Sequence, residues 1–175
     1  MDVFEVIEKR RSIRKYKPKP IPDKDLKKIL EAGRLAPSGG NKQPWSFVVV
    51  TEPETKKALS IAANNQKFIA DAGAVVVALG DPTSFPAKKH YVPYLQDPMI
   101  AIEHMVLAST ALGYGTCWIG AFNQEEVKKI LKIPENLAVV ALLPIGVPDE
   151  SPQPRPRKAF KEVFFKNSYG VPLEL

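Results

Sequence analysis

The sequence predicts one domain in which a β-sheet is covered by helices, of the α/β or α+β class. Short apolar runs of strand length alternate along the chain with segments of helical apolar spacing. The chain has 175 residues, which argues for a single domain over residues 1–175. Hydrophobic residues make up 45% of it, so one core can form without disulfides or metals.

Two helices and a strand are predicted in the first 50 residues. Asp2 can cap a helix over residues 2–11, where apolar residues recur at helical spacing. A second helix spans residues 23–35, and Pro37 forces its end. After a turn-rich loop, the apolar run WSFVVV at residues 45–50 is rich in β-branched residues and predicts a strand.

The middle of the chain is predicted to hold two helices and one strand before a long loop. Residues 54–63 and 67–72 have helical character. The apolar run AVVVALG at residues 74–80 predicts a buried strand. Residues 81–97 are predicted to form an irregular loop.

The most apolar helix is predicted over residues 98–112. Apolar side chains run nearly all the way round it, which predicts a central position or a place in an interface. A strand over residues 116–120 follows a turn with two glycines. A capping box at Asn123 then opens a helix over residues 123–131, and residues 137–146 form the last predicted strand.

The tail from residue 147 onward combines a proline-rich spacer with an apolar segment. The apolar residues after the prolines are Phe160, Val163, Phe164 and Phe165. So short a segment cannot form its own core. We therefore expect it to pack against a distant part of the protein or against a second subunit.

Positive charge gathers at the two ends of the chain. The net charge is +6, and much of the positive charge falls within residues 9–19 and 155–161. Such a balance suits either nucleic acid or a phosphorylated small molecule. Against a nucleic-acid-binding module, the charges lie beside Pro and Ser loops rather than along one helix face, and no aromatic-rich RNA-binding signature is present.

Several other classes of protein are disfavoured by composition. The single cysteine, Cys117, excludes an intramolecular disulfide and a zinc site built on paired thiolates, and two separated histidines make a metal centre improbable. The sequence contains no run of about 18 apolar residues, so no membrane helix is predicted. No apolar core of a signal peptide precedes the first helix, so we expect a cytoplasmic protein. Cys117 itself is interpreted as a small buried strand residue, with a nucleophile as the alternative.

The segment RRSIRKY at residues 10–16 is a candidate phosphate site. It places Arg10, Arg11, Ser12 and Arg14 within five residues. Forked guanidinium donors together with a hydroxyl suit a phosphate. The same cations also complement the C-terminal dipole of the first helix, so the segment alone allows both interpretations.

Two further polar segments are candidates. In APSGGNKQPW at residues 36–45, Ser38, Asn41 and Gln43 bring amide and hydroxyl groups into one exposed loop. Such a loop could recognise a ring with alternating C=O and N–H edges, although these residues are also ordinary turn formers. In PRPRKAF at residues 154–160, Arg155 and Arg157 alternate with prolines in an extended segment, which places both guanidinium groups on one side. The segment is either an anion-binding site or a solvated basic linker.

Taken in order, these segments resemble the FMN-dependent nitroreductase family. The pattern is Arg-Arg-Ser-x-Arg near residue 10, A-P-S-x-x-N-x-Q-P-W about 25 residues later, G-x-G-T-C-W-I-G, and P-I-G-x-P ahead of the basic tail. The resemblance covers nearly the whole chain. It implies an α+β fold with a central, mostly antiparallel sheet flanked by helices, in an intertwined homodimer with two FMN sites at the interface.

The resemblance also implies roles for particular residues. Arg10, Arg11, Ser12 and Arg14 would hold the FMN phosphate and the pyrimidine side of the ring, and Arg155 and Arg157 would close on the phosphate. Pro37, Ser38 and Asn41, with Gln43 close by, would come from the partner subunit. Gly120 and Ala121 would offer backbone N–H groups to the ring, and Asn65 and Lys67 fall near a position that touches it. The helix at 98–112 would form the dimer core, and residues 147–175 would be a C-terminal extension packing on the partner.

The activity implied is that of an NAD(P)H-dependent FMN oxidoreductase. Hydride would be taken from NADH or NADPH, and electrons would leave by ping-pong exchange to a nitroaromatic, quinone or flavin-type acceptor. No side chain is expected to act as catalytic acid or base, because the flavin carries the chemistry. The alternative within the same fold is an FMN-binding storage or sensor protein with little turnover, and neither nucleic acid nor membrane is an expected partner.

Overall fold

The computed structural model describes residues 1–87 and 90–175. Within these residues, four strands form one sheet in the order β1-β2-β4-β3, and every neighbouring pair is antiparallel. The strands are β1 (Trp45–Val50), β2 (Ala74–Gly80), β3 (Gly115–Thr116) and β4 (Ala138–Gly146). The helices are α1 (Val3–Lys9), α2 (Asp23–Arg34), α3 (Pro53–Ala62), α4 (Phe68–Asp71), α5 (Pro93–Ala111) and α6 (Gln124–Leu131), with short 3-10 turns at Gly39–Asn41 and Phe160–Glu162. The predicted α+β class with an antiparallel sheet is confirmed.

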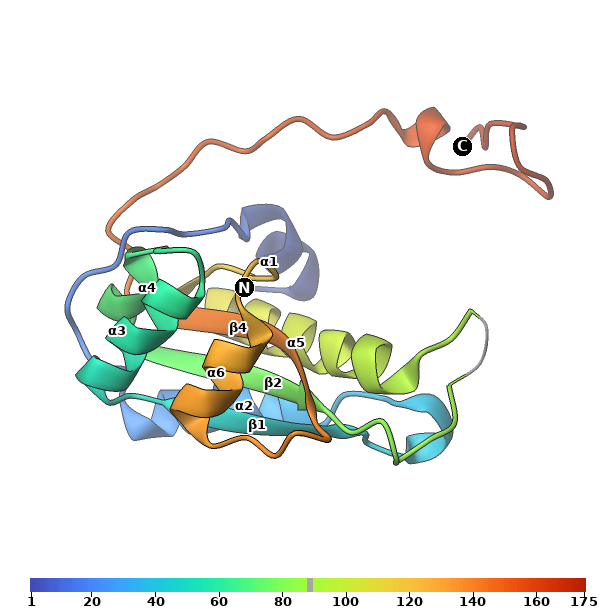
Figure 1. Ribbon diagram of the computed structural model, residues 1–175. Helices are drawn as coiled ribbons and strands as arrows, with labels where there is room; N and C mark the ends of the chain where they lie inside the picture. The colour runs from blue at the N-terminus through green and yellow to red at the C-terminus, as the bar shows by residue number, and fades with distance from the viewer. Residues whose placement is uncertain (88–89) are drawn as a thin grey trace.

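The sheet is covered by helices on both faces, which explains why its central strands are continuously apolar. All residues of β2 are buried. Val75 and Val77 point into a core built with Leu59 of α3 and Val127 of α6. Val76 points to the other side, into a core that α2 and α5 complete. Figure 1 shows α6 in front of the sheet and α2 and α5 behind it.

Most predicted elements lie within a residue or two of their observed bounds. The strands β1 and β2 coincide with the predicted runs, and β4 begins one residue later than predicted. Asp2 caps α1 in a full capping box with Glu5. Asn123 caps α6 by accepting a hydrogen bond from the N–H of Glu126 at 3.2 Å. Helix α1 ends at Lys9, so the arginine segment lies beyond the helix rather than in its last turn.

The prediction of an irregular loop up to residue 97 was wrong, because α5 already begins at Pro93. Proline is favoured at the first position of a helix, so by sequence either Pro93 or Pro98 could begin this one. The observed helix starts at the first of them and contains the second. Pro98 has no N–H to donate to the carbonyl of Tyr94, one turn earlier. That carbonyl lies against Gly80, where an added Cβ would come within 1.8 Å of its oxygen.

The strand predicted over residues 116–120 is regular only at residues 115–116. The chain stays beside β4 further on, since Ile119 and Leu142 exchange backbone hydrogen bonds of 2.9 and 3.0 Å. Between these points, the N–H of Cys117 reaches the carbonyl of Pro144 at 3.4 Å. Pro144 has no N–H with which to complete the pair, so the ladder is interrupted there.

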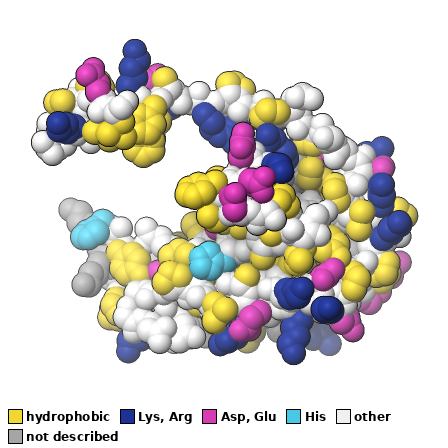
Figure 2. All heavy atoms as spheres, turned by 180° about the vertical axis from the view of Figure 1, so that it is seen from behind, with side chains coloured by type: hydrophobic (Ala, Val, Ile, Leu, Met, Phe, Trp, Pro, Cys, Tyr) yellow, Lys and Arg dark blue, Asp and Glu magenta, His cyan; other side chains and the backbone are white. Residues whose placement is uncertain are grey.

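The C-terminal residues, 147–175, form an extended arm outside the two cores. Figures 1 and 2 show the arm leaving the body and standing clear of it. Its tip folds on itself, with the rings of Phe160 and Phe164 4.4 Å apart and a backbone hydrogen bond of 3.0 Å from Leu173 to Phe164. Phe160 and Phe164 remain about half exposed.

Apolar side chains are also exposed on the body of the molecule. On α1, Phe4 is 79% exposed and Ile7 54%. Helix α5 buries Ile102 and Met105 but exposes Met99 and Ile100 on its other side. In the described part of the chain, no helix is long and apolar enough to cross a membrane.

Candidate functional site

The two basic ends of the chain meet in one cavity. It measures about 170 Å³. Its lining consists of Arg10, Arg11, Ser12, Arg14, Pro152, Gln153, Arg155 and Arg157. We call it the arginine cavity. It brings together the arginines of both predicted phosphate-binding segments and Ser12, and none of its lining residues is acidic. Dark blue side chains gather in Figure 2 where the arm leaves the body.

The first wall of the arginine cavity is an extended segment that follows α1. Ser12 forms a parallel bridge with Thr116, and the N–H of Ile13 donates to the Thr116 carbonyl at 2.8 Å. Ile13 and Tyr16 point into the core. The Tyr16 hydroxyl donates to the carbonyl of Ile13 at 2.8 Å, and burial raises the pKa of this phenol well above its usual range. The buried side chains thereby fix which way the arginines face.

The second wall is held against the first by a short backbone ladder at the base of the arm. The N–H of Lys17 donates to Val147 at 2.9 Å, and the N–H of Asp149 donates to Lys15 at 2.9 Å. The Lys15 ammonium and Asp149 carboxylate are 3.1 Å apart. The carboxylate of Glu150 accepts the N–H of Arg14. Sequence reasoning missed Glu150, because an acid beside a basic tail is also typical of a solvated linker.

Cys117 lies next to this site but is not equipped as a nucleophile. Its side chain is buried, as predicted. Burial raises the pKa of the thiol, with smaller opposing contributions from Arg14 and the Ser12 hydroxyl. A thiol with a raised pKa is largely protonated at neutral pH and therefore weakly nucleophilic.

The polar loop at residues 36–44 does not line the arginine cavity of its own chain. Figure 1 places it at the other end of the molecule, beside the start of α5. The N–H of Gln43 donates to the Ser38 hydroxyl at 2.9 Å, and the Gln43 amide donates to the Asn41 carbonyl at 3.2 Å. Pro37 and Asn41 are exposed. Within one chain, the structure therefore keeps Pro37, Ser38, Asn41 and Gln43 apart from the arginines.

Two other predicted segments do lie side by side. The Gln66 amide donates to the Ala121 carbonyl at 3.3 Å and to the Ala63 carbonyl at 2.9 Å. The N–H of Asn123 donates to the carbonyl of Ala62 at 2.8 Å. The surface where the two segments meet is called the ledge. It exposes the predicted residues Asn65, Lys67, Gly120 and Ala121. Gln66 was missed by sequence reasoning, since nothing in the sequence shows that its amide bridges the two loops.

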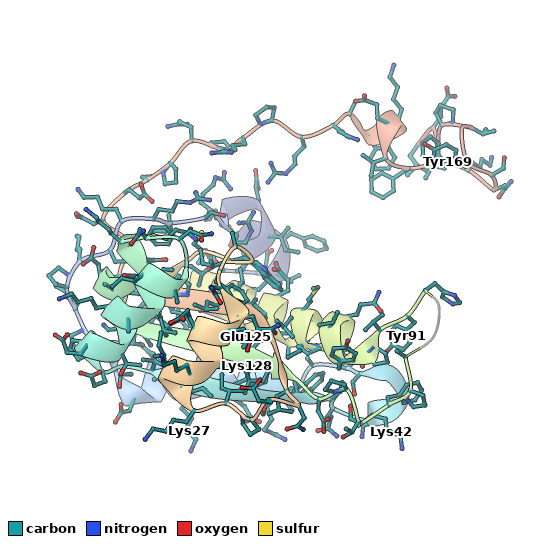
Figure 3. All side chains as sticks on the ribbon, in the orientation of Figure 1. Lys27, Lys42, Tyr91, Glu125, Lys128 and Tyr169 are labelled. Atoms are coloured by element: carbon teal, nitrogen blue, oxygen red, sulfur yellow. The ribbon has the colours of Figure 1, made fainter. Side chains whose placement is uncertain are left out.

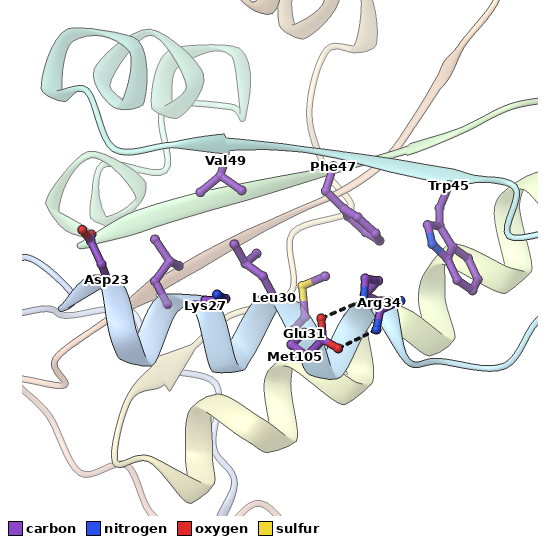
Figure 4. Close-up of a pocket in the computed structure, with 10 residues that line it drawn as sticks. Asp23, Lys27, Leu30, Glu31, Arg34, Trp45, Phe47, Val49 and Met105 are labelled. Carbon is purple, nitrogen blue, oxygen red and sulfur yellow. Dashed lines mark hydrogen bonds and ion pairs between the residues drawn. The ribbon is translucent and has the colours of Figure 1, made fainter.

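A second, apolar hollow lies between α2 and the edge strand β1 (Figure 4). Its volume is about 630 Å³, and we call it the edge groove. Leu30, Phe47 and Val49 line its floor and walls. At its rim, Arg34 donates two hydrogen bonds to Glu31 at 2.6 and 2.7 Å, and this pairing lowers the pKa of the Glu31 carboxyl.

Comparison with known proteins points to one family. The model of the family described as "Nitroreductase family" matches residues 7–83 and 56–147. A nitroreductase family protein from Clostridium novyi has a crystal structure with a TM-score of 0.83 and 38% identity, covering 98% of this chain and 97% of its own. A Thermus thermophilus protein named NADH dehydrogenase is 32% identical over 186 residues, covering 89% of this chain and 91% of its own.

A third relative has been solved with a nicotinamide dinucleotide. It is the NADPH:FMN oxidoreductase from Vibrio harveyi, complexed with NAD+. Its TM-score with this chain is 0.87 at 30% identity, covering 99% of this chain and 79% of its own.

Proposed function

Because this chain belongs to the nitroreductase family, we propose that it is an FMN-dependent oxidoreductase that takes hydride from NADH or NADPH. The electrons pass by ping-pong exchange to a nitroaromatic, quinone or flavin-type acceptor. The Vibrio harveyi relative supports both the cofactor and the donor, since its name specifies NADPH and FMN.

The observation that carries this proposal is the arginine cavity. Five guanidinium groups and the Ser12 hydroxyl line it, and they come from opposite ends of the chain. Bidentate donors of this kind fit the doubly charged phosphate of FMN, because charge-assisted hydrogen bonds are roughly twice as strong as neutral ones. Five like charges in one cavity repel one another, and a bound anion would relieve that repulsion.

The residues that would hold FMN divide into three groups. Arg10, Arg11, Ser12, Arg14, Arg155 and Arg157 hold the phosphate and the pyrimidine side of the ring. The ledge at Gly120 and Ala121, beside Asn65 and Lys67, offers backbone groups to the ring. Pro37, Ser38, Asn41 and Gln43 come from a second subunit. When bound, FMN supplies the redox chemistry, and the cation of Arg10 or Arg14 stabilises negative charge on the reduced ring.

The site is proposed to be complete only in a homodimer. One chain alone keeps the polar loop away from the arginine cavity. The exposed apolar side chains on α1, on the outer side of α5 and on the arm could supply an interface, since large exposed apolar surface marks association.

The arm, residues 147–175, is proposed to pack on the partner subunit. In its own chain it leaves Phe160 and Phe164 half exposed. The edge groove offers a matching seat, because it is apolar and lies along the free edge of β1. An exchanged arm would bury both surfaces at once, which predicts a dimer that does not dissociate without unfolding.

The visible absorption spectrum of the purified protein tests the function. We expect flavin bands that bleach when NADH or NADPH is added without oxygen, and that return on addition of a quinone or a nitroaromatic. Bands that persist with both nucleotides would favour the storage or sensor alternative. Absence of bands after incubation with FMN would refute the proposal, and salt-sensitive binding of DNA or RNA by that flavin-free protein would favour the nucleic-acid alternative.

A further inference from the structure

The polar loop at residues 36–44 has a backbone that needs support from outside. Gly40, Asn41 and Gln43 all have positive φ, at 56°, 54° and 49°. Residues with side chains rarely adopt this region, and they persist there only when the surroundings hold them. The bonds between Ser38, Asn41 and Gln43 lie within the loop itself, so they cannot fix its place on the body.

The support comes from Asp97, in the second turn of α5. Its side chain is 2% exposed. One carboxylate oxygen accepts the N–H of Gly39 at 3.0 Å, and the other accepts the Tyr91 hydroxyl at 2.7 Å. Four residues further along α5, Ala101 is fully buried, so the carboxylate is mounted on a helix that is anchored in the core.

The loop and the Tyr91 ring are in close contact. A Cβ added at Gly39 would lie 2.3 Å from the Tyr91 hydroxyl oxygen, so a side chain at residue 39 would displace the hydroxyl that donates to Asp97. The hydrogen bond to Asp97 raises the pKa of Tyr91, which keeps the phenol protonated as a donor. Figure 3 shows Tyr91 and Lys42 at the same end of the molecule, at the start of α5.

We propose that Asp97 is a positioning residue for the cofactor: through Gly39 and Tyr91 it holds the polar loop in the shape that presents Ser38 and Asn41 to FMN across the dimer. The inference rests on the proposed function. Asp97 itself does not touch the flavin, and its effect is exerted through the loop.

The test measures FMN binding to the full-length dimer by quenching of flavin fluorescence. Asp97→Ala removes both acceptors, and we expect affinity for FMN to fall about tenfold or more. Asp97→Asn can still accept from Gly39 through its carbonyl and donate to Tyr91 through its amide, so we expect it to stay within about threefold of the original affinity. Tyr91→Phe removes one donor and should lie between them.

Two controls and one further readout separate positioning from general damage. Asp81→Ala removes a carboxylate that, among the residues the structure describes, accepts from Thr83 of its own turn at 2.7 and 2.8 Å, and Tyr94→Phe changes a neighbouring phenol. Both should bind FMN as the unchanged chain does. In flavin-free protein, amide exchange over residues 38–43 should be faster in Asp97→Ala and unchanged in Asp97→Asn.

The outcomes are distinct. Wild-type FMN affinity in Asp97→Ala, or equal losses in Asp97→Ala and Asp97→Asn, would overturn the inference while leaving the proposed function intact. If the unchanged chain and the Asp81→Ala control also bind no FMN, the proposed function fails and the inference fails with it. A graded loss with rescue by asparagine supports the positioning role.

Discussion

Arg157 offers the sharpest test of the arginine cavity, because its guanidinium belongs to the arm and not to the body. Its Nη1 donates to the carbonyls of Arg155 and Pro156 at 3.1 and 3.3 Å, and its side chain lines the arginine cavity. A hydrogen bond between charged partners contributes about 1.5 to 3 kcal/mol. Arg157 is exposed, so screening by water places the expected loss near the lower value. Arg157→Ala should therefore weaken FMN about tenfold.

The assay compares two ligands that differ only in the phosphate. FMN and riboflavin are titrated by fluorescence against the unchanged chain and Arg157→Ala. The tenfold loss should appear with FMN and be absent with riboflavin, and it should shrink as salt is raised. Lys129→Ala is the control, since Lys129 is an exposed cation on α6 that lines neither the arginine cavity nor the edge groove. Equal losses for both ligands, or no loss for either, would refute a phosphate contact at Arg157.

Three further outcomes follow from the packing. Gly80→Ala should destabilise the protein by about 3 kcal/mol in urea denaturation, because its Cβ would lie 1.8 Å from the backbone oxygen of Tyr94, whereas Gly120→Ala, with no atom within 4 Å, should change stability by less than about 0.5 kcal/mol. Burial raises the pKa of both Cys117 and Tyr16, so at high pH the folded chain keeps protons that the unfolded chain releases. The free energy of unfolding should therefore be constant up to about pH 8.5, the usual pKa of a free thiol, and fall as the pH rises further. An unfolding free energy that does not change between about pH 7 and 10.5 in denaturation experiments would contradict this. Removal of residues 152–175 should weaken the dimer, so that light scattering detects monomer at concentrations where the full chain is dimeric, and should remove most of the FMN affinity. Unchanged dimerisation would contradict the exchanged arm.

The parts of the fold that sequence reasoning placed well are those where one pattern dominates. The runs at residues 45–50 and 74–80 are apolar, β-branched and bounded by turn residues, and both are strands to the residue. The two errors occur at prolines. Pro98 was interpreted as the first helical residue, although Pro93 serves that role, and Pro144 on β4 interrupts pairing with a segment whose own sequence looks like a strand. The interruption at Pro144 depends on which segment pairs with β4, and the sequence of residues 116–120 does not show this.

The candidate site shows the same division. Residue types alone indicated that Arg10 and Arg157 suit an anion, but not that they share a cavity. That depends on the ladder between residues 15–17 and 147–149 and on the Glu150 carboxylate, which join segments 130 to 136 residues apart in the chain. Asp97 left no sequence signal either, since it stands at the end of a predicted loop and its partners Gly39 and Tyr91 come together with it only in the fold.

The arginine cavity has a consequence for how the protein is made. One wall is synthesised among the first 14 residues and the other not before residue 157. A growing chain can therefore complete its sheet and both cores, which end at residue 146, while half of the anion site has yet to be translated. A ligand that needs both walls can therefore be held only after Arg157 has been translated. A chain that stops after β4 would lack Arg155 and Arg157, and with them one wall of the cavity.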